Sequence, residues 1–241
     1  MATATAMRAA TAAFFSPSVS SSPNPRHHQH PLFSARRGRT HPRRRLRALP
    51  GTDCNAKRNI AKLLANSIIY RYLCSEDLLE DVLGGKEALA TFRETDEKGY
   101  LEVETEGLKQ LTSMGSLVLC CGDGAVMNST NLGLLRHGVS IWIDVPLELA
   151  VNDMLKSMGA NAISDPDSFS KAMGKLRQRY DNLKERYANS DVTVSVQNVA
   201  SQLGYGSIDS LSLEDMVIEI VRQIEKLVKA KAMMEAAGKP E

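Results

Sequence analysis

Short apolar runs alternate with longer amphipathic segments along the chain after residue 50. Four runs have the length and apolar content of strands, namely residues 67–73, 117–122, 139–145 and 192–196. Hydrophobic positions repeat with a helical period in the segments between and after them, which are residues 77–85, 105–115, 147–158, 169–191 and 212–238. This alternation predicts an α/β fold in which helices flank a parallel sheet.

Two of these segments give further detail. The runs 117–122 and 139–145 are almost wholly apolar, which is typical of strands that are buried on both faces of a parallel sheet. The last helical segment carries its own start signal, because Ser212 and Asp215 have the spacing of a capping box. We therefore expect a long C-terminal helix that begins close to Ser212.

The first fifty residues differ in composition from the rest. They contain nine arginines and ten Ser/Thr residues, and neither a lysine nor an acidic residue precedes Asp53. Segments rich in arginine and serine and poor in acidic residues are typical of organelle transit peptides. We expect a disordered organelle transit peptide over residues 1–48 and a folded domain over residues 49–241. A basic arm that binds nucleic acid is the alternative interpretation.

The balance of charge reverses after residue 50. The chain has 30 Lys/Arg and 28 Asp/Glu residues, so setting aside the nine arginines leaves 21 basic against 28 acidic side chains, a net charge near −7. An acidic domain argues against nucleic acid as a partner, and no apolar run approaches the ~20 residues of a membrane span. The four cysteines lack metal-binding spacing, so we expect no metal site.

The stretch GTDCNAKRN, residues 51–59, has the length of a phosphate-binding loop, which is written G-x-x-x-x-G-K-[ST]. Gly51 and Lys57 match this motif. Ala56 replaces the second glycine, where a left-handed backbone would cost about 1 kcal/mol or more. Arg58 replaces the hydroxyl that binds Mg²⁺, and a guanidinium cannot ligate a metal.

A phosphate loop needs a buried strand in front of it, and the sequence before Gly51 offers none by pattern. The segment RRRLRALP has no long apolar run, and Pro50 removes a backbone donor. We therefore expect the first central strand to be missing or degenerate.

The stretch LVLCCGDGAVMNSTNLGLLRHGVSIWIDVPLEL, residues 117–149, combines a strand, a glycine turn, a helix and a second strand that leaves through D-V-P. It resembles the shikimate kinases, and the resemblance extends at fixed spacing from about Gly51 to Val196. It implies the P-loop kinase fold of the nucleoside-monophosphate-kinase type. The reaction of that family is the ATP-dependent phosphorylation of the shikimate 3-hydroxyl, which relies on cations that neutralise phosphate charge.

The resemblance also assigns substrate-site positions, and most of them are substituted. The family's D-x-D falls on Cys74 and Glu76, so a thiol replaces the first carboxylate. We interpret Glu76 as a solvated acid at a helix start. Leu101 and Leu183 stand where the family has two arginines that clamp the substrate carboxylate, although the nearby family glutamate is retained as Glu104.

The glycine turn of the family is also altered. Gly122, Asp123 and Gly124 occupy it, so a carboxylate enters a turn that has three glycines in the family. Asp123 would repel a substrate carboxylate, or it is a turn residue that faces solvent. The polar segment at residues 159–168 aligns with the mobile lid, and it contains no arginine to contact ATP.

These substitutions predict an inactive shikimate-kinase-like protein that uses neither ATP nor Mg²⁺ and acts through an unknown protein partner. The resemblance to a plastid branch of the family implies a place in the chloroplast stroma and a role in chloroplast biogenesis. A small-molecule kinase of altered specificity, working with Lys57 and Glu76, is the alternative. A further alternative is an ordinary enzyme that lost its first strand through a different exon.

Overall fold

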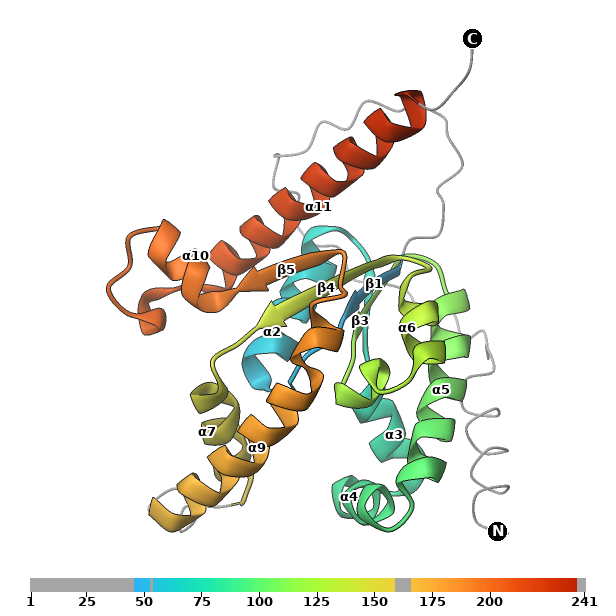
Figure 1. Cartoon of the computed structure of the whole chain (residues 1–241), viewed down its shortest axis with the longest axis vertical. Coiled ribbons are helices and arrows are strands. Elements are labelled where there is room, and N and C mark those ends of the chain that lie inside the picture. The colour runs from blue at the N-terminus through green and yellow to red at the C-terminus, as the bar shows by residue number, and fades with distance from the viewer. Residues whose placement is uncertain (1–45, 53, 159–165, 238–241) are drawn as a thin grey trace, which may run out of the picture.

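The computed structural model describes residues 46–52, 54–158 and 166–237 (Figure 1). A five-stranded sheet of order β2-β3-β1-β4-β5 lies at its centre, and every neighbouring pair is parallel. The strands are β1 (Leu46–Leu49), β2 (Arg71–Cys74), β3 (Leu117–Cys120), β4 (Val139–Asp144) and β5 (Val192–Ser195). The predicted α/β class with a parallel sheet is confirmed.

Helices connect the strands and cover both faces of the sheet (Figure 1). The α-helices are α2 (Asn55–Ser67), α3 (Ser75–Leu83), α4 (Lys86–Thr95), α5 (Glu97–Ser113), α6 (Ser129–Leu135), α7 (Leu147–Met158), α9 (Pro166–Tyr187), α10 (Val196–Gln202) and α11 (Leu213–Ala237). Two short 3₁₀ helices are η1 (Asp123–Val126) and η2 (Ile208–Ser210).

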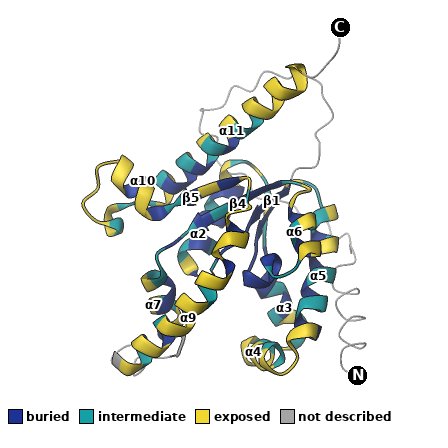
Figure 2. Cartoon of the chain, viewed as in Figure 1, coloured by how far each residue is buried: buried dark blue, intermediate teal, exposed yellow. Residues whose placement is uncertain are grey.

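The core consists of two layers of apolar side chains, one on each face of the sheet. Along β3, Leu117 and Leu119 pack with α5, α6 and the end of α9, whereas Val118 and Cys120 pack with α2 and α11. This alternation follows from the two-residue period of a strand. Because both layers are apolar, β1 and β3 are buried along their whole length and β4 along most of its length, whereas the edge strands β2 and β5 include exposed residues (Figure 2).

Strand β1 corrects the expectation that the first central strand is missing. It pairs with β3 on one side and β4 on the other, and Leu46, Ala48 and Leu49 are almost completely buried. Four residues are enough for a central strand here, and Pro50 follows the last of them, so the ladder needs no N–H from it. The strand also crosses the expected boundary at residue 48, so the domain includes residues 46–48.

The prediction for residues 67–73 is wrong in its first half. Helix α2 extends to Ser67, and the turn that follows contains Ile69 with a positive φ of 58°. Tyr70 then donates its N–H to the carbonyl of Ala65, and β2 begins only at Arg71. The two isoleucines that suggested a strand therefore belong to the connection between helix and strand.

Helix α11 begins where the capping box predicts. The Asp215 N–H donates to Ser212 Oγ at 3.1 Å, and the Ser212 N–H donates to an Asp215 carboxylate oxygen at 3.1 Å. Its first half is anchored by Met216, Ile220 and Ile224, while its last turns are exposed and project from the body (Figure 2). In the described part of the chain, no helix combines the length and apolar content that crossing a membrane requires.

The position of β1 predicts how far the chain tolerates truncation. A chain that begins at residue 46 should unfold cooperatively in urea, because every described strand is retained. A chain that begins at residue 51 lacks the central strand and should lose cooperative unfolding. Far-ultraviolet circular dichroism during urea titration measures both, and a cooperative transition in the shorter chain would contradict the assignment of β1.

Candidate functional site

The candidate site lies at the carboxyl ends of β1, β2 and β3, which is the usual place for ligands in parallel sheets. The connection from β1 to α2 begins at Gly51, whose φ of 142° is unfavourable for other residues. Cys54 caps α2, since its sulfur accepts from the Lys57 N–H at 3.4 Å. Ala56 lies in the first helical turn, so the left-handed strain expected there does not arise.

Lys57 is completely buried, with an exposure of 0%. Its ammonium group donates to the Gly51 carbonyl at 2.6 Å and to the Cys121 carbonyl at 2.7 Å. The lysine of the phosphate-loop motif therefore ties the loop after β1 to the chain leaving β3. Two of its donor directions point at backbone oxygens instead of toward a ligand.

An acidic side chain from α7 accepts a hydrogen bond from the first turn of α2. The Asn55 N–H donates to a carboxylate oxygen of Asp153, on α7, at 2.8 Å. The N-terminus of a helix attracts anions because its first N–H groups lack partners within the helix. Here the carboxylate of Asp153 satisfies one of those groups.

Arg58 faces the start of α3. Its guanidinium pairs with Asp77 and also lies 3.5 Å from a carboxylate oxygen of Glu76. Glu76 is only 9% exposed and lies 3.9 Å from Arg93 as well. The interpretation of Glu76 as a solvated acid is therefore wrong. It is a buried carboxylate between two guanidinium groups.

Cys74 ends β2 directly opposite Cys120 of β3 in the strand register. Its thiol is buried. The hydrogen bond to Cys120 and burial together raise the pKa of Cys74 far above the ordinary thiol value. This position therefore carries a neutral group, which cannot replace a carboxylate as a metal ligand.

Gly122 and Gly124 permit the close approach of two acidic side chains. A Cβ on Gly122 would collide with the carboxylate of Glu76, and one on Gly124 would collide with that of Glu104. Asn131 donates to the Gly124 carbonyl at 3.2 Å and so holds the turn from the other side. The glycines of this turn are required by the protein's own carboxylates.

Asp123 lies between these glycines and is 8% exposed. It does not repel its surroundings, and it does not face solvent. Its carboxylate pairs with Arg179 of α9, lies 3.8 Å from Arg93 of α4 and accepts from the Tyr187 hydroxyl at 2.6 Å. The expectation that Asp123 faces solvent is therefore wrong, because two arginines that the resemblance did not indicate converge on it, whereas repulsion of a substrate carboxylate stays a prediction.

The two leucines at the expected arginine positions lie in different surroundings. Leu183 is 8% exposed and lines an open cleft of about 780 Å³ between α4 and α9, together with Glu76, Arg93 and Arg179. Leu101 is half-buried, packs near Tyr100 and lines a separate groove on the outer side of α5. The structure thus brings Leu183 to the cleft and leaves Leu101 outside it.

Glu104 is the most isolated charge-bearing group of the site. It is 1% exposed, and neither of its carboxyl oxygens has a hydrogen-bond partner among the described residues. Burial, aided by Asp123 and opposed by Arg93, raises the pKa of Glu104 from about 4.5 to about 7. The carboxyl group is therefore largely protonated in slightly acidic solution.

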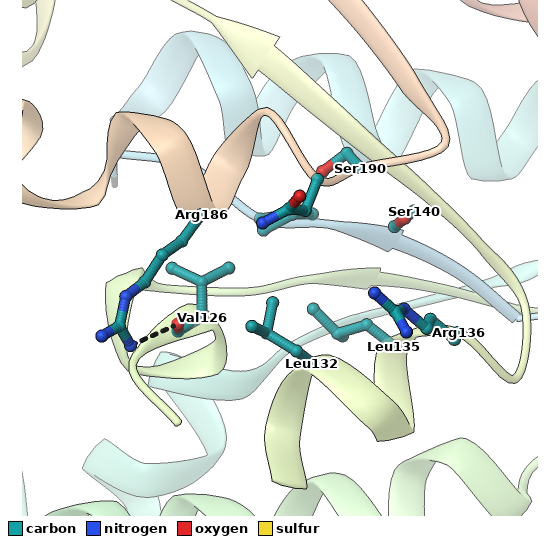
Figure 3. Close-up of a pocket in the computed structure, with 9 residues that line it drawn as sticks. Val126, Leu132, Leu135, Arg136, Ser140, Arg186 and Ser190 are labelled. Atoms are coloured by element: carbon teal, nitrogen blue, oxygen red, sulfur yellow. Dashed lines mark hydrogen bonds between the residues drawn. The ribbon is translucent and has the colours of Figure 1, made fainter. Parts of the chain in front are cut away.

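A further cavity, lined in part by η1 and α6, is too small for a substrate. Its volume is about 10 Å³, which is close to the space of a single water molecule. Figure 3 shows that side chains such as Val126, Leu135 and Arg186 surround it. The Arg186 guanidinium donates to the Val126 carbonyl at 3.3 Å, so the cavity marks where α9 holds η1 in place.

Sequence reasoning missed Arg93, Arg179 and Tyr187. Arg179 lies four residues before Leu183, one helical turn away on the same face of α9, so the helical period could have indicated it. Arg93 stacks on the Tyr100 ring, with 5.2 Å between the guanidinium carbon and the ring centroid. No sequence signal brings α4 to this position.

Comparisons with known sequences agree with the motif analysis. The family profile described as "Shikimate kinase" matches residues 54–225. "Probable inactive shikimate kinase like 1, chloroplastic" of Arabidopsis thaliana is 40% identical over 197 residues, 80% of this chain and 66% of that protein. "Shikimate kinase 2, chloroplastic" of Oryza sativa subsp. japonica is 30% identical over 184 residues, 75% of this chain and 60% of that protein. This chain therefore spans less than two thirds of the length of these relatives.

Solved structures give the same fold. The shikimate kinase of Acinetobacter baumannii in complex with shikimate has a TM-score of 0.59 and 20% identity, covering 76% of this chain and 93% of that one. The shikimate kinase of Bacteroides thetaiotaomicron has a TM-score of 0.60 and 16% identity, covering 75% and 98%. The chain has the P-loop kinase fold of these enzymes.

The contacts of Lys57 predict a loss of stability when its amine is removed. Lys57→Met keeps the length of the side chain but leaves the carbonyls of Gly51 and Cys121 without these bonds. We expect the free energy of unfolding to fall by about 2 kcal/mol or more, measured by urea titration. Lys62→Met, at an exposed position of the same helix, is the matched control. Equal stability of the two variants would contradict the assigned role of Lys57.

The raised pKa of Glu104 predicts a pH dependence of stability. The unfolded chain ionises Glu104 above about 4.5, whereas the folded protein does so only near 7, so the contribution of Glu104 to stability is most favourable below 4.5 and decreases up to about 7. The loss amounts to at most about 3 kcal/mol. Glu104→Gln should remove this part of the pH dependence and be more stable than the wild type at pH 8. Parallel stability curves for the two proteins would refute the assignment.

Proposed function

The chain belongs to the shikimate kinase family, and from its site we propose that it is a catalytically inactive member with a non-enzymatic role in the plastid. The observation that carries this proposal is the position of Lys57. An amine that is 0% exposed and bonded to two backbone carbonyls is poorly placed to neutralise the phosphates of a nucleotide. In phosphoryl transfer the protein does little covalent chemistry, and catalysis depends mainly on positioning and on this neutralisation of phosphate charge.

The residues around Lys57 also fit a Mg²⁺–nucleotide complex poorly. Arg58 supplies only donors where a metal needs an oxygen ligand, and its guanidinium pairs with Asp77 and Glu76. Asp153 places a negative charge at the start of α2, where it would repel a phosphate. We therefore propose that the protein uses neither ATP nor a metal ion.

The plastid role rests on the relatives. Several plant relatives are chloroplastic proteins, and one of them is named probable inactive. We infer a stromal protein that supports chloroplast biogenesis through a protein partner. The acidic composition after residue 50 argues against nucleic acid as that partner.

A kinase of altered specificity is the competing proposal. It is favoured by the open cleft of about 780 Å³, which is large enough for a small substrate. It requires that Lys57 leave its two carbonyls and that Mg²⁺–ATP bind. Nucleotide binding therefore separates the two proposals.

The test combines catalysis with binding. With shikimate, ATP and Mg²⁺, release of ADP in a coupled assay should stay at the level of the enzyme-free control, and titration calorimetry with Mg²⁺–ATP should show no binding heat. A bacterial shikimate kinase run in parallel establishes that the assay works. Turnover above background would overturn the proposal, and binding heat without shikimate turnover would favour the altered kinase.

The biogenesis role has a separate test in the plant. Disruption of the gene should give pale tissue that supplied aromatic amino acids do not restore, because aromatic synthesis is not the missing function. Complementation with Lys62→Met should restore green tissue. A green plant that needs only aromatic amino acids would show that the protein serves shikimate metabolism instead.

A further inference from the structure

Asp123 is a carboxylate that contacts two of the arginines lining the cleft of about 780 Å³, Arg93 and Arg179. The cleft lies between α4 and α9, and its basic lining residues are Lys86, Arg93, Lys175 and Arg179. Asp123 itself is 8% exposed and belongs to η1, between the two helices that provide these cations. It is thus held within the protein beside Arg93 and Arg179, while Glu76, Glu94 and Glu97 also line the cleft.

The contacts of Asp123 combine two guanidinium groups and one hydroxyl donor around a single carboxylate. Arg179 pairs with one carboxylate oxygen, Oδ2, and Arg93 lies 3.8 Å from the same atom. The Tyr187 hydroxyl donates to the other oxygen, Oδ1, at 2.6 Å. Planar guanidinium groups combined with a hydroxyl donor are well suited to a carboxylate, and they come here from α4 and from two turns of α9.

The surroundings disfavour a second anion next to Asp123. Gly122 lies against the carboxylate of Glu76, and Gly124 lies against that of Glu104, so three acidic side chains already surround this turn. A further carboxylate would meet the negative charge of Asp123 and Glu76 without gaining the donors that Asp123 occupies. The charge of Asp123, and the space it fills, therefore decide what the cleft accepts.

We propose that Asp123 is a built-in carboxylate ligand of Arg93, Arg179 and Tyr187 that excludes small carboxylic acids from the cleft. When its side chain is removed, the same three groups bind a free carboxylate. This inference rests on the proposed function, because it assigns to Asp123 the loss of acid binding in a site that we regard as inactive. Asp123 is in this sense the specificity-determining residue of the cleft.

The experiment compares the wild type with Asp123→Gly, which opens a space of carboxylate size beside the arginines. Shikimate is the probe, and its methyl ester is the uncharged control of nearly equal shape. Titration calorimetry should give binding of shikimate to the variant that is about tenfold or more tighter than to the wild type. The affinity should decrease with added salt, and the ester should gain nothing.

The double variant Asp123→Gly/Arg179→Met tests whether the arginine is responsible. It should lose the affinity gained by Asp123→Gly. Equal binding to the wild type and Asp123→Gly, equal binding of the ester, or full binding by the double variant would each overturn the proposal. A folded Asp123→Gly variant that binds no shikimate would overturn it as well.

Thermal unfolding gives a second readout, because a ligand that binds only the folded state raises the melting temperature. Acetate should raise the melting temperature of Asp123→Gly and leave that of the wild type unchanged at the same ionic strength. If Asp123→Gly does not fold, Asp123→Ala keeps a Cβ, removes the carboxylate and opens nearly the same space, and formate is then the probe. The absence of a formate-dependent increase in that variant would overturn the proposal.

These outcomes are distinct from those that test catalytic inactivity. Shikimate binding to the wild type without turnover would overturn the role of Asp123 and leave the inactive assignment in place. Turnover of shikimate by the wild type would overturn both inferences, because turnover requires binding, whereas a gain of acid binding in Asp123→Gly without turnover by the wild type supports both.

Discussion

The structure depends on the pairing of charges that are buried at the carboxyl edge of the sheet. Lys57 is the central case, because a fully buried ammonium group without partners would cost several kcal/mol. Its bonds to Gly51 and Cys121 satisfy that charge and also join the ends of β1 and β3. The loop after β1, the start of α2 and the glycine turn after β3 all adjoin these two hydrogen bonds, so their relative positions depend on them.

The unusual residues of the site are matched to one another. Arg58 pairs with Glu76 and Asp77, and Asp123 pairs with Arg179. Breaking one partner of such a buried pair generally costs more than the pair itself contributes. Replacing Arg58 or Asp123 alone with the family residue therefore removes an ionic partner of Glu76 and Asp77 or of Arg179, so recovery of an active site requires several changes together.

The sequence predicted those parts of the fold that depend on local pattern. The apolar runs located β3 and β4, and Ser212 located the start of α11. Strand β1 was not predicted because it is short and contains an arginine. Its burial depends on β3 and β4, which come from distant parts of the chain. The same holds for the partners of Asp123. The helical period can indicate Arg179, but the contact with Arg93 depends on the tertiary packing of α4, which no local pattern predicts.

Glu104 shows where this internal pairing is incomplete. The family pattern places an arginine near it, but Leu101 stands there and faces the outer side of α5. Arg93 is close enough to lower the pKa of Glu104 in part, but it makes no hydrogen bond to the carboxyl group, so burial dominates and the pKa is raised to about 7. A site that had to bind an ionised glutamate for catalysis would not retain this penalty. Its retention is consistent with a framework in which packing against Gly124, and not charge, is what Glu104 supplies.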